Sequence, residues 1–414
     1  MLPPEIAYVV GIDIAKRAHV ACALQASTGK VHLRPRSFAA SAEGYAELRA
    51  VLQTWGAPPT ILVGLEATGC LWEPLYEDLT RAGYTVLVLN PRQTVAWSAS
   101  LGLRAKTDGI DAHTLARGVL AGYAQASTVP SEVVQELRAL TRARRDLVQG
   151  QTAAKQRLRD ELVVLFPELP EHTPAQCDLL APAVLRLLEV YSSAHAIAQA
   201  APDDLAALLA DVSAGQWTAD HAQELQRVAR QSAASSRAVG ARGVVVRTMV
   251  RHLLDLYARL EELEAAIAEV LAHDEDGQRL QTLPGVGPVI AATVRAELGD
   301  VARFAGVDQV IAYAGLDPRT HQSGAFSGQK HLSKRGPGAL RHALYLAVLN
   351  AVRNRAEWRE RYQRLLDRGR AKKEALTILS RAYLKVVYQV LRTATAYDPL
   401  ALTTPHPCPA RGRA

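Results

Sequence analysis

Apolar residues in the first ninety positions fall into short runs separated by polar turns. These runs predict strands at residues 6–13, 17–26 and 30–38, a helix at 41–55, a strand ending at Glu66, a helix at 71–82 and a strand from Tyr84. Three strands followed by alternating helices and strands are typical of an α/β layer with a mixed sheet. We therefore expect an N-terminal α/β domain over residues 1–128.

The apolar period changes to that of long helices after Pro130. One seam has a spacing near 4-3 between Val133 and Leu165. A second seam follows the 4-3 spacing without a break, through Met249, Leu253, Leu256, Leu260, Leu263, Ile267 and Val270. Such residues occupy the a and d positions of coiled coils. We expect a coiled-coil region at 129–275 with an inserted helical subdomain at 168–241. Packing within one chain and packing between protomers are both consistent with the seams.

A third region, at 276–400, is predicted to be mostly helical. The sequence PGVGP at 284–288 lies between two helical segments and resembles the hairpin of a helix-hairpin-helix DNA-binding element. In such an element the small residues let the backbone approach a phosphate, and helix N-terminal N–H groups point at the anion. An ordinary tight turn between helices has the same pattern. Residues 401–414 form a Pro- and Arg-rich tail that we expect to be disordered.

Positive charge is concentrated in the C-terminal part of the chain. Sixteen Lys and Arg residues lie between Asp317 and Lys385, against five Asp and Glu. This excess is larger than the net charge of +7 of the whole chain, so the remaining residues are net acidic. The asymmetry predicts a polyanion-binding C-terminal portion. One predicted helix contributes seven arginines to a surface expected to contact a nucleic-acid backbone: Arg353, Arg355, Arg359, Arg361, Arg364, Arg368 and Arg370.

Cysteine usage and hydropathy indicate the compartment. The four cysteines are far apart and form no C-x-x-C pair, which argues against a disulfide framework or a zinc site and favours a reducing cytosol. No apolar run approaches the roughly 18–20 residues of a membrane helix, and the N-terminus lacks the features of a signal peptide. We expect a soluble cytoplasmic protein without a membrane partner.

Four carboxylates lie where α/β sheets place ligands. Asp13 closes VVGIDIA, Glu66 closes ILVGLEATG, and Asp108 and Asp111 share KTDGIDAHTLA. A charge at the end of an apolar strand is costly to bury unless it is paired or binds a metal. Asp108 and Asp111 are three residues apart at a helix start, so they share one face. Each alone is consistent with a helix cap or a first-turn acid. The four together predict a site for Mg²⁺, with Mn²⁺ as a substitute.

A Gly-rich cationic loop carries three candidate nucleophiles, Ser323, Ser327 and Ser333. A nucleophilic serine needs activation and nearby positive charge to stabilise phosphate oxygens. The residues alone do not choose among the serines, and a phosphate-binding loop with incidental serines is equally consistent. Four basic residues of this region are predicted to contact nucleic acid: Lys330, Lys334, Arg335 and Arg341.

Several motifs in the same order resemble those of DEDD-type insertion-sequence transposases, the family that includes Piv-like DNA invertases and bridge-RNA-guided recombinases. GIDIAK, LEATG, NPRQT and KTDGIDAHTLA resemble its RuvC-like domain. In that ribonuclease-H-like fold the first and fourth strands are neighbours. LPGVGPVIAATVRAELGD, AYAGLDPRTHQSG and LSKRGPGALRHALY resemble the second transposase domain. The match covers nearly the whole chain, although the 168–241 insertion and the tail are larger than expected for a compact member.

The resemblance implies the chemistry and the partners. It implies that Asp13, Glu66, Asp108 and Asp111 bind catalytic metal ions, and that Ser323, in the Gln-Ser-Gly motif, is joined covalently to DNA. It also implies double-stranded donor and target DNA, a structured noncoding guide RNA, and a dimer or tetramer associated with the bacterial nucleoid. The expected function is therefore a site-specific recombinase that mobilises its own insertion element.

Two alternatives use the same residues differently. A RuvC-like, structure-selective DNA nuclease would use the acids to activate water and would need no serine. An inactive nucleic-acid-binding derivative would show no metal dependence.

Overall fold

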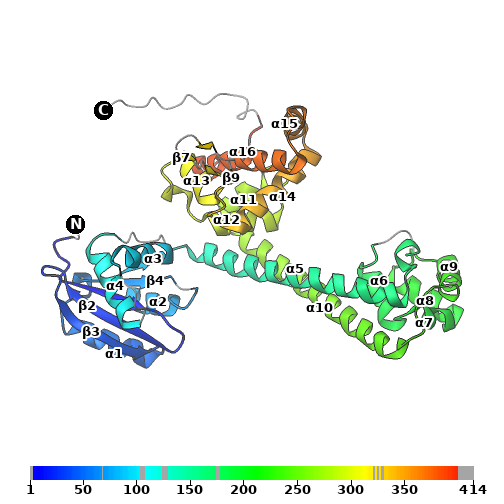
Figure 1. Cartoon of the computed structure of the whole chain (residues 1–414), viewed down its shortest axis with the longest axis horizontal. Helices are drawn as coiled ribbons and strands as arrows, with labels where there is room; N and C mark the ends of the chain where they lie inside the picture. Colours follow the sequence, from blue (N-terminus) through cyan, green and yellow to red (C-terminus); the bar gives the residue numbers. More distant parts are fainter. Residues whose placement is uncertain are drawn as a thin grey trace. The chain divides into compact units, whose positions relative to one another are not determined.

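The computed structural model describes residues 3–67, 69–102, 108–123, 129–173, 178–319, 322–323, 326–327 and 331–399 (Figure 1). The chain divides into two compact units, residues 1–129 and 130–414. None of the described helices is both long and apolar enough to cross a membrane.

A five-stranded mixed sheet forms the centre of the first unit. Its strand order is β3-β2-β1-β4-β5, with strands β1 (Tyr8–Asp13), β2 (Ala18–Gln25), β3 (Val31–Ala39), β4 (Ile61–Glu66) and β5 (Thr85–Leu89). The first three strands pair antiparallel, whereas β1 pairs with β4, and β4 with β5, in parallel. The predicted succession of strands and helices along the chain and the predicted neighbourhood of the first and fourth strands are confirmed.

Helices cover both faces of this sheet. They are α1 (Ala42–Gln53), α2 (Glu73–Arg81), α3 (Pro91–Ser100) and α4 (Asp108–Leu120). Helix α1 begins where the hydroxyl of Ser41 accepts a hydrogen bond from the N–H of Gly44, a common N-cap arrangement. Leucines of α1 and α2 pack in the core on one face, whereas Leu115 and Val119 of α4 pack on the other.

Two long helices, α5 (Glu132–Leu165) and α10 (Val239–Ala272), pack against each other in the second unit (Figure 1). They are antiparallel, because the end of α5 shares one core with the start of α10, and Leu137 shares another core with Ile267. Four residues of the predicted α10 seam are buried within the single chain: Leu253, Leu256, Leu260 and Ile267. The seam is therefore used inside the chain.

The segment between the two long helices folds as the predicted helical subdomain. Its helices are α6 (Pro182–Val190), α7 (Ala194–Gln199), α8 (Pro202–Val212) and α9 (Ala219–Arg230). Their leucines join the end of α5 and the start of α10 in one core, which includes Phe166 and Trp217.

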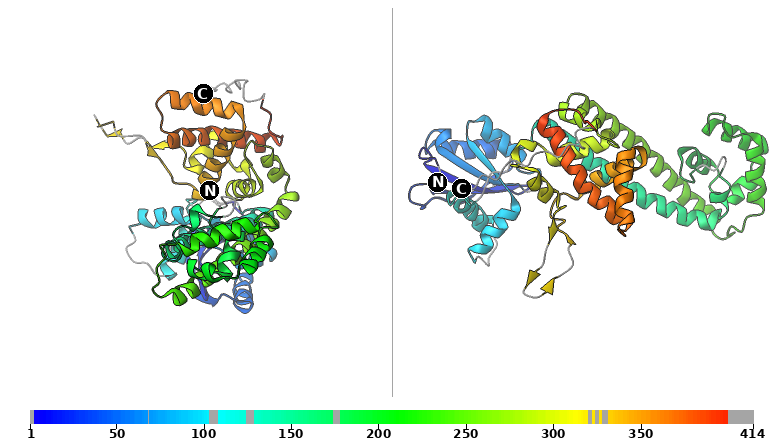
Figure 2. Two further views of the ribbon diagram at one scale, coloured as in Figure 1. Left: turned by 90° about the vertical axis from the view of Figure 1, so that its right-hand side faces the viewer. Right: turned by 90° about the horizontal axis from the view of Figure 1, so that it is seen from above.

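The C-terminal part is mostly helical, as predicted, with α11 (Glu275–Gln281), α12 (Pro288–Leu298), α13 (Val307–Ala314), α14 (Gly338–Asn354), α15 (Ala356–Asp367) and α16 (Lys372–Thr393). The segment predicted as an irregular loop contains four two-residue strands: β6 (Pro318–Arg319), β7 (Gln322–Ser323), β8 (Phe326–Ser327) and β9 (His331–Leu332). Strands this short carry no alternating pattern that a sequence reveals. Figure 2 shows the β7–β8 pair standing clear of the helices of this unit. The predicted disordered tail lies outside the described residues.

Candidate active site

Two of the predicted carboxylates lie at the same end of two neighbouring strands of the sheet. Strands β1 and β4 are in parallel register, with Ile12 opposite Leu65, so Asp13 and Glu66 follow at the same level. Side chains alternate between the faces of a strand. Asp13 therefore shares the face of Gly11, and Glu66 the face of Gly64, both of which meet α4. Both carboxylates are half-buried.

A buried threonine of α3 contacts Glu66. The Thr94 hydroxyl lies 3.1 Å from Oε2 of Glu66 and 3.0 Å from the carbonyl oxygen of Pro91, which makes it a hydrogen-bond donor to this pair of acceptors. Because Thr94 is held by its own helix, the contact fixes the orientation of the carboxylate. Sequence reasoning missed this role, although Thr94 belongs to the NPRQT motif.

A buried histidine holds the turn after Asp13. The N–H of Ala15 donates a hydrogen bond to Nδ1 of His19 at 3.2 Å, and the imidazole packs between the rings of Phe38 and Tyr45. Burial lowers the pKa of His19, so the neutral ring is favoured. Its Nε2 has no hydrogen-bond partner among the described residues. In the sequence, His19 occupies an inward-facing position of a predicted strand. Ordinary core residues occupy such positions too, so the position alone does not reveal this role.

Helix α4 carries the other two acids in its first turn. Asp108 is exposed and Asp111 half-buried. The same turn lies against β3, because a Cβ atom at Gly109 would be 3.1 Å from Cβ of Pro35. Within the described ranges, no three His, Cys, Asp or Glu side chains lie close enough together to hold a metal ion. The structure thus brings Asp13 and Glu66 together without a third carboxylate beside them.

The carboxylate pair fits part of a metal site. Half-buried carboxylate oxygens at the end of parallel strands are ligands of the type that hard cations take. A site made by all four acids requires the side chains of Asp108 and Asp111 to lie closer to Asp13 and Glu66 than they do here. Residues 103–107, which precede the first turn of α4, lie outside the described residues.

The predicted nucleophile lies in a short β ladder of the second unit. Ser323 in β7 pairs antiparallel with Phe326 in β8, and Arg319 in β6 pairs with His331 in β9. The side chain of Ser323 lies outside the described part of the structure. At the base of this segment the hydroxyl of Ser333 donates to the carboxylate of Asp317. The Ser333 N–H also donates to the Asp317 carbonyl at 3.0 Å.

The predicted basic contacts differ in their surroundings. Lys334 and Arg335 are exposed, whereas Nη1 of Arg341 donates to the carbonyl oxygens of Ala314 at 3.1 Å and Gly336 at 2.7 Å. Arg341 therefore braces the base of the loop. Lys330 lies outside the described residues.

The arginine-rich helix is also partly engaged within the chain. Arg359 donates to the carbonyl oxygens of Val352 and Arg353 at the end of α14. Arg361 stacks over the ring of Trp358, and Arg370 pairs with Glu374 at 2.7 Å. Arg353, Arg355, Arg364 and Arg368 are exposed. The prediction that one helix carries all seven arginines is wrong, because Arg353 lies in α14 and Arg368 follows the end of α15.

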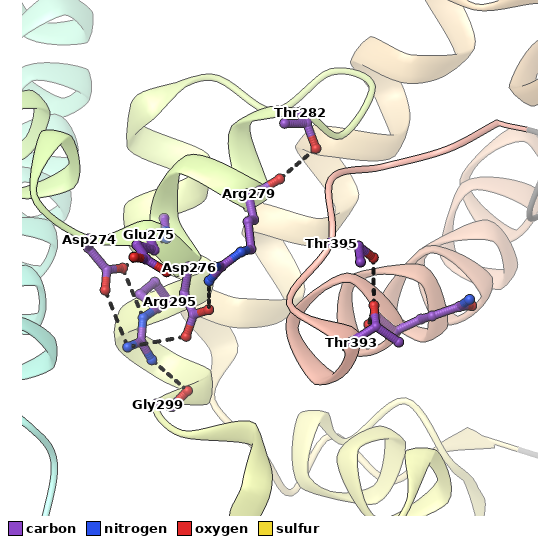
Figure 3. Close-up of polar contacts among 11 residues, drawn as sticks. Asp274, Glu275, Asp276, Arg279, Thr282, Arg295, Gly299, Thr393 and Thr395 are labelled. Carbon is purple, nitrogen blue, oxygen red and sulfur yellow. Dashed lines mark hydrogen bonds and ion pairs between the residues drawn. The ribbon is translucent and has the colours of Figure 1, made fainter.

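The predicted tight turn between two helices lies between α11 and α12. Gly285 has φ +80°, and a Cβ atom there would lie 2.5 Å from the carbonyl oxygen of Ala347 in α14. This glycine permits close packing of the turn against α14, which corrects its interpretation as a residue exposed to phosphate. Gly287, in contrast, has open space around it. Figure 3 shows Arg295 of α12 binding Asp274 and Asp276, which ties the two helices together.

Two family models match the chain. The model DEDD_Tnp_IS110, described as a transposase, matches residues 10–167, and the transposase IS116/IS110/IS902 family matches residues 277–363. The first covers most of the sheet and α1–α5, and the second runs from α11 into α15. Together they span more than half of the chain.

Relatives of similar length include proteins of insertion elements and of a DNA inversion system. The chain is 27% identical to the insertion element IS110 43.6 kDa protein of Streptomyces coelicolor, over 71% of this chain and 72% of the relative. It is 25% identical to the insertion element IS116 44.8 kDa protein of Streptomyces clavuligerus, over 94% and 96%. It is 23% identical to the pilin gene-inverting protein of Moraxella bovis, over 94% and 97%.

These matches define a class of enzymes that cleave DNA and transfer its strands. The chain belongs to the IS110/IS116/IS902 family of transposases.

Proposed function

We propose that the chain is a site-specific DNA recombinase that mobilises an insertion element through a serine–phosphate ester. The observation that carries the proposal is the placement of Asp13 and Glu66 at the same end of adjacent parallel strands in a transposase-family chain. Relatives that bear the names of insertion elements and of a pilin gene-inverting protein support the substrate class.

Ser323 is the proposed nucleophile. Its oxygen attacks the phosphorus of a DNA phosphodiester and gives up its proton, while the bond from phosphorus to the leaving nucleoside oxygen breaks and that oxygen takes up a proton. One phosphate ester replaces another, so the reverse attack by a strand end rejoins DNA without an external energy source. Placement in a short β ladder outside the helical core supports access to a large substrate.

Asp13, Glu66, Asp108 and Asp111 are the proposed ligands of a divalent cation, Mg²⁺ by preference. When bound, such an ion polarises the scissile phosphate and stabilises the leaving oxygen. Thr94 orients Glu66, and His19 holds the turn that follows Asp13. Asp108 and Asp111, in the first turn of α4, complete the proposed site.

The proposed partners are double-stranded donor and target DNA, a structured noncoding guide RNA, and further copies of the chain in a dimer or tetramer. The basic excess between Asp317 and Lys385 supports a polyanionic partner for the C-terminal part.

The nucleophile is tested by denaturing electrophoresis of the protein with labelled substrate DNA. Wild type is expected to form a slow-migrating covalent adduct that Ser323→Ala loses while it still binds DNA. Ser327→Ala is the matched control in the same ladder and keeps the adduct. Ser333→Ala keeps it as well, because its hydroxyl is committed to Asp317. An adduct that survives in Ser323→Ala and disappears in Ser333→Ala assigns the chemistry to Ser333.

Metal dependence is tested with EDTA and with Asp13→Asn and Glu66→Gln. Both variants keep the shape of the side chain and remove its charge, so we expect cleavage to fall by orders of magnitude with DNA binding retained. Cleavage in wild type without any covalent adduct would favour the metal-activated-water nuclease. Full activity in EDTA would contradict the metal site.

A further inference from the structure

A groove of about 540 Å³ opens in the second unit between α5, α12 and α14. Its lining mixes apolar residues with polar ones from all three helices. The apolar part is formed by Val148, Val289, Ile290, Ala343 and Leu346. Neither the proposed chemistry nor the arginines of α15 use this surface.

The groove is lined by more positive than negative charge. Arg142, Arg144 and Arg145 come from one stretch of α5, and among the described lining residues the one acid is Glu297. Glu297 lies 3.9 Å from Arg142, and Arg144 pairs at 2.7 Å with Glu264. Arg145 is 49% exposed, and its acidic partner is the adjacent Asp146. Exposed pairs of this kind are weak, so the Arg145 guanidinium is available to another anion.

Two helix N-termini add to this charge. Val289 and Ile290 in the first turn of α12, and Gly338 and Ala339 in the first turn of α14, line the groove. Neither helix has a side-chain hydrogen bond at its N-cap. The first N–H groups of a helix lack partners within the helix and carry partial positive charge.

We propose that this groove binds the sugar–phosphate backbone of one strand of the DNA substrate. Guanidinium groups and N-terminal amides bind phosphate oxygens, and the apolar surface between them contacts the sugars. The groove is too small to admit a double helix, so the duplex lies outside with one backbone along it. The inference rests on the proposed function for its choice of DNA, and it adds a contact surface on α5 and α12 to the basic loop and α15.

The test is the salt dependence of binding by the full-length protein to a labelled DNA duplex, in EDTA so that binding is measured without cleavage. Arg145→Gln is expected to make the slope of log affinity against log salt shallower by about 0.9, the value for one phosphate contact. Arg157→Gln is the matched control, since it removes the same charge from an exposed position of α5 about 18 Å further along the helix. Its slope should equal that of wild type.

A second variant probes the same groove from α14. Ala339→Glu places a carboxylate in the first turn of α14, where the helix dipole favours it, so thermal stability should hold while DNA affinity falls. Equal slopes for Arg145→Gln and Arg157→Gln, or wild-type affinity of Ala339→Glu, would overturn the proposal. The proposal would also be overturned if the substitutions weakened binding of a competing RNA hairpin and left binding of the DNA duplex unchanged. Loss of the covalent adduct in the earlier assay leaves this test unaffected, so failure of the two proposals is distinguishable.

Discussion

Two glycines, which have no side chain, set how closely α4 approaches the sheet at the candidate site. Gly11 and Gly64 are paired in the register of β1 and β4. A Cβ atom at Gly11 would lie 2.3 Å from the carbonyl oxygen of Ala112, and one at Gly64 would lie 2.7 Å from Val119 Cγ2. Glycine at both positions lets α4 lie directly on the strands that carry Asp13 and Glu66.

Gly11→Ala is therefore expected to destabilise the protein and to displace α4. The added carbon meets helix backbone, which cannot rotate away, so a cost of about 1–3 kcal/mol in the free energy of unfolding is expected. Gly150→Ala is the control, because this α5 position has no heavy atom near an added Cβ and alanine there should stabilise by about 0.5–1 kcal/mol. Denaturant unfolding of both full-length variants provides the measurement. A Gly11→Ala protein as stable as wild type would contradict the close approach.

At this scale the sequence predicts positions better than contacts. The apolar runs placed Asp13 and Glu66 at strand ends, because the length and period of a strand are local properties of the sequence. The order of the strands along the chain in turn reflects the topology of the sheet. Thr94 and His19 were not predicted as their supports, since a side-chain contact depends on where α3 and the β1–β2 turn are placed in three dimensions. Gly285 shows the same limit, because its neighbour Ala347 is 62 residues away in sequence.

At the scale of elements, a largely buried ion pair fixes the α11–α12 hairpin. Asp274 caps α11 by accepting from the N–H of Gly277 at 2.8 Å, and it binds Nε of Arg295 at 2.9 Å. Arg295 also donates to the carbonyl oxygen of Gly299 at the end of α12. The residues of the pair are 9% and 11% exposed, so removal of one partner leaves a charge with little water around it (Figure 3).

Arg295→Met is expected to lower the free energy of unfolding by about 3–5 kcal/mol, because it leaves the Asp274 charge unpaired. Asp274→Asn combined with Arg295→Met removes both charges and keeps a cap, so much of that loss should be recovered. Arg279→Met is the comparison, since its partners Glu275 and Asp276 are 80% and 30% exposed and a smaller change is expected. Thermal unfolding of wild type, Asp274→Asn, Arg295→Met, the double variant and Arg279→Met measures the coupling between Asp274 and Arg295. Additive effects of the two substitutions would show that the ion pair does not hold the hairpin.

Periodicity predicted the long helices but not the full set of residues that they bury. The 4-3 seam of α10 correctly included Leu253 and Leu260, yet Val246 and Val250 are buried and Leu263 is only half-buried. An α-helix drifts relative to a seven-residue repeat, and α10 contacts α6 of the inserted segment as well as α5. The sequence does not reveal these partners.

For the whole molecule, the buried seam decides which surfaces are free to join protomers. Leu256 is 4% exposed and belongs to the core formed by α5, α10 and the inserted helices. An assembly of the proposed dimer or tetramer must therefore use other surfaces than this seam. The four carboxylates belong to the first unit and Ser323 belongs to the second.

Leu256→Lys is expected to destabilise the chain by several kcal/mol, because it buries a charge without a partner. The mass of the protein that stays folded should equal that of wild type. Val244→Lys on the same helix is the matched control, since Val244 is 54% exposed and its stability should hardly change. Circular dichroism monitors the thermal unfolding, and light scattering at low temperature gives the mass of the folded protein. Together they distinguish a seam within one chain from a seam between protomers. A Leu256→Lys protein that melts like wild type but has a smaller mass would place the seam between protomers instead.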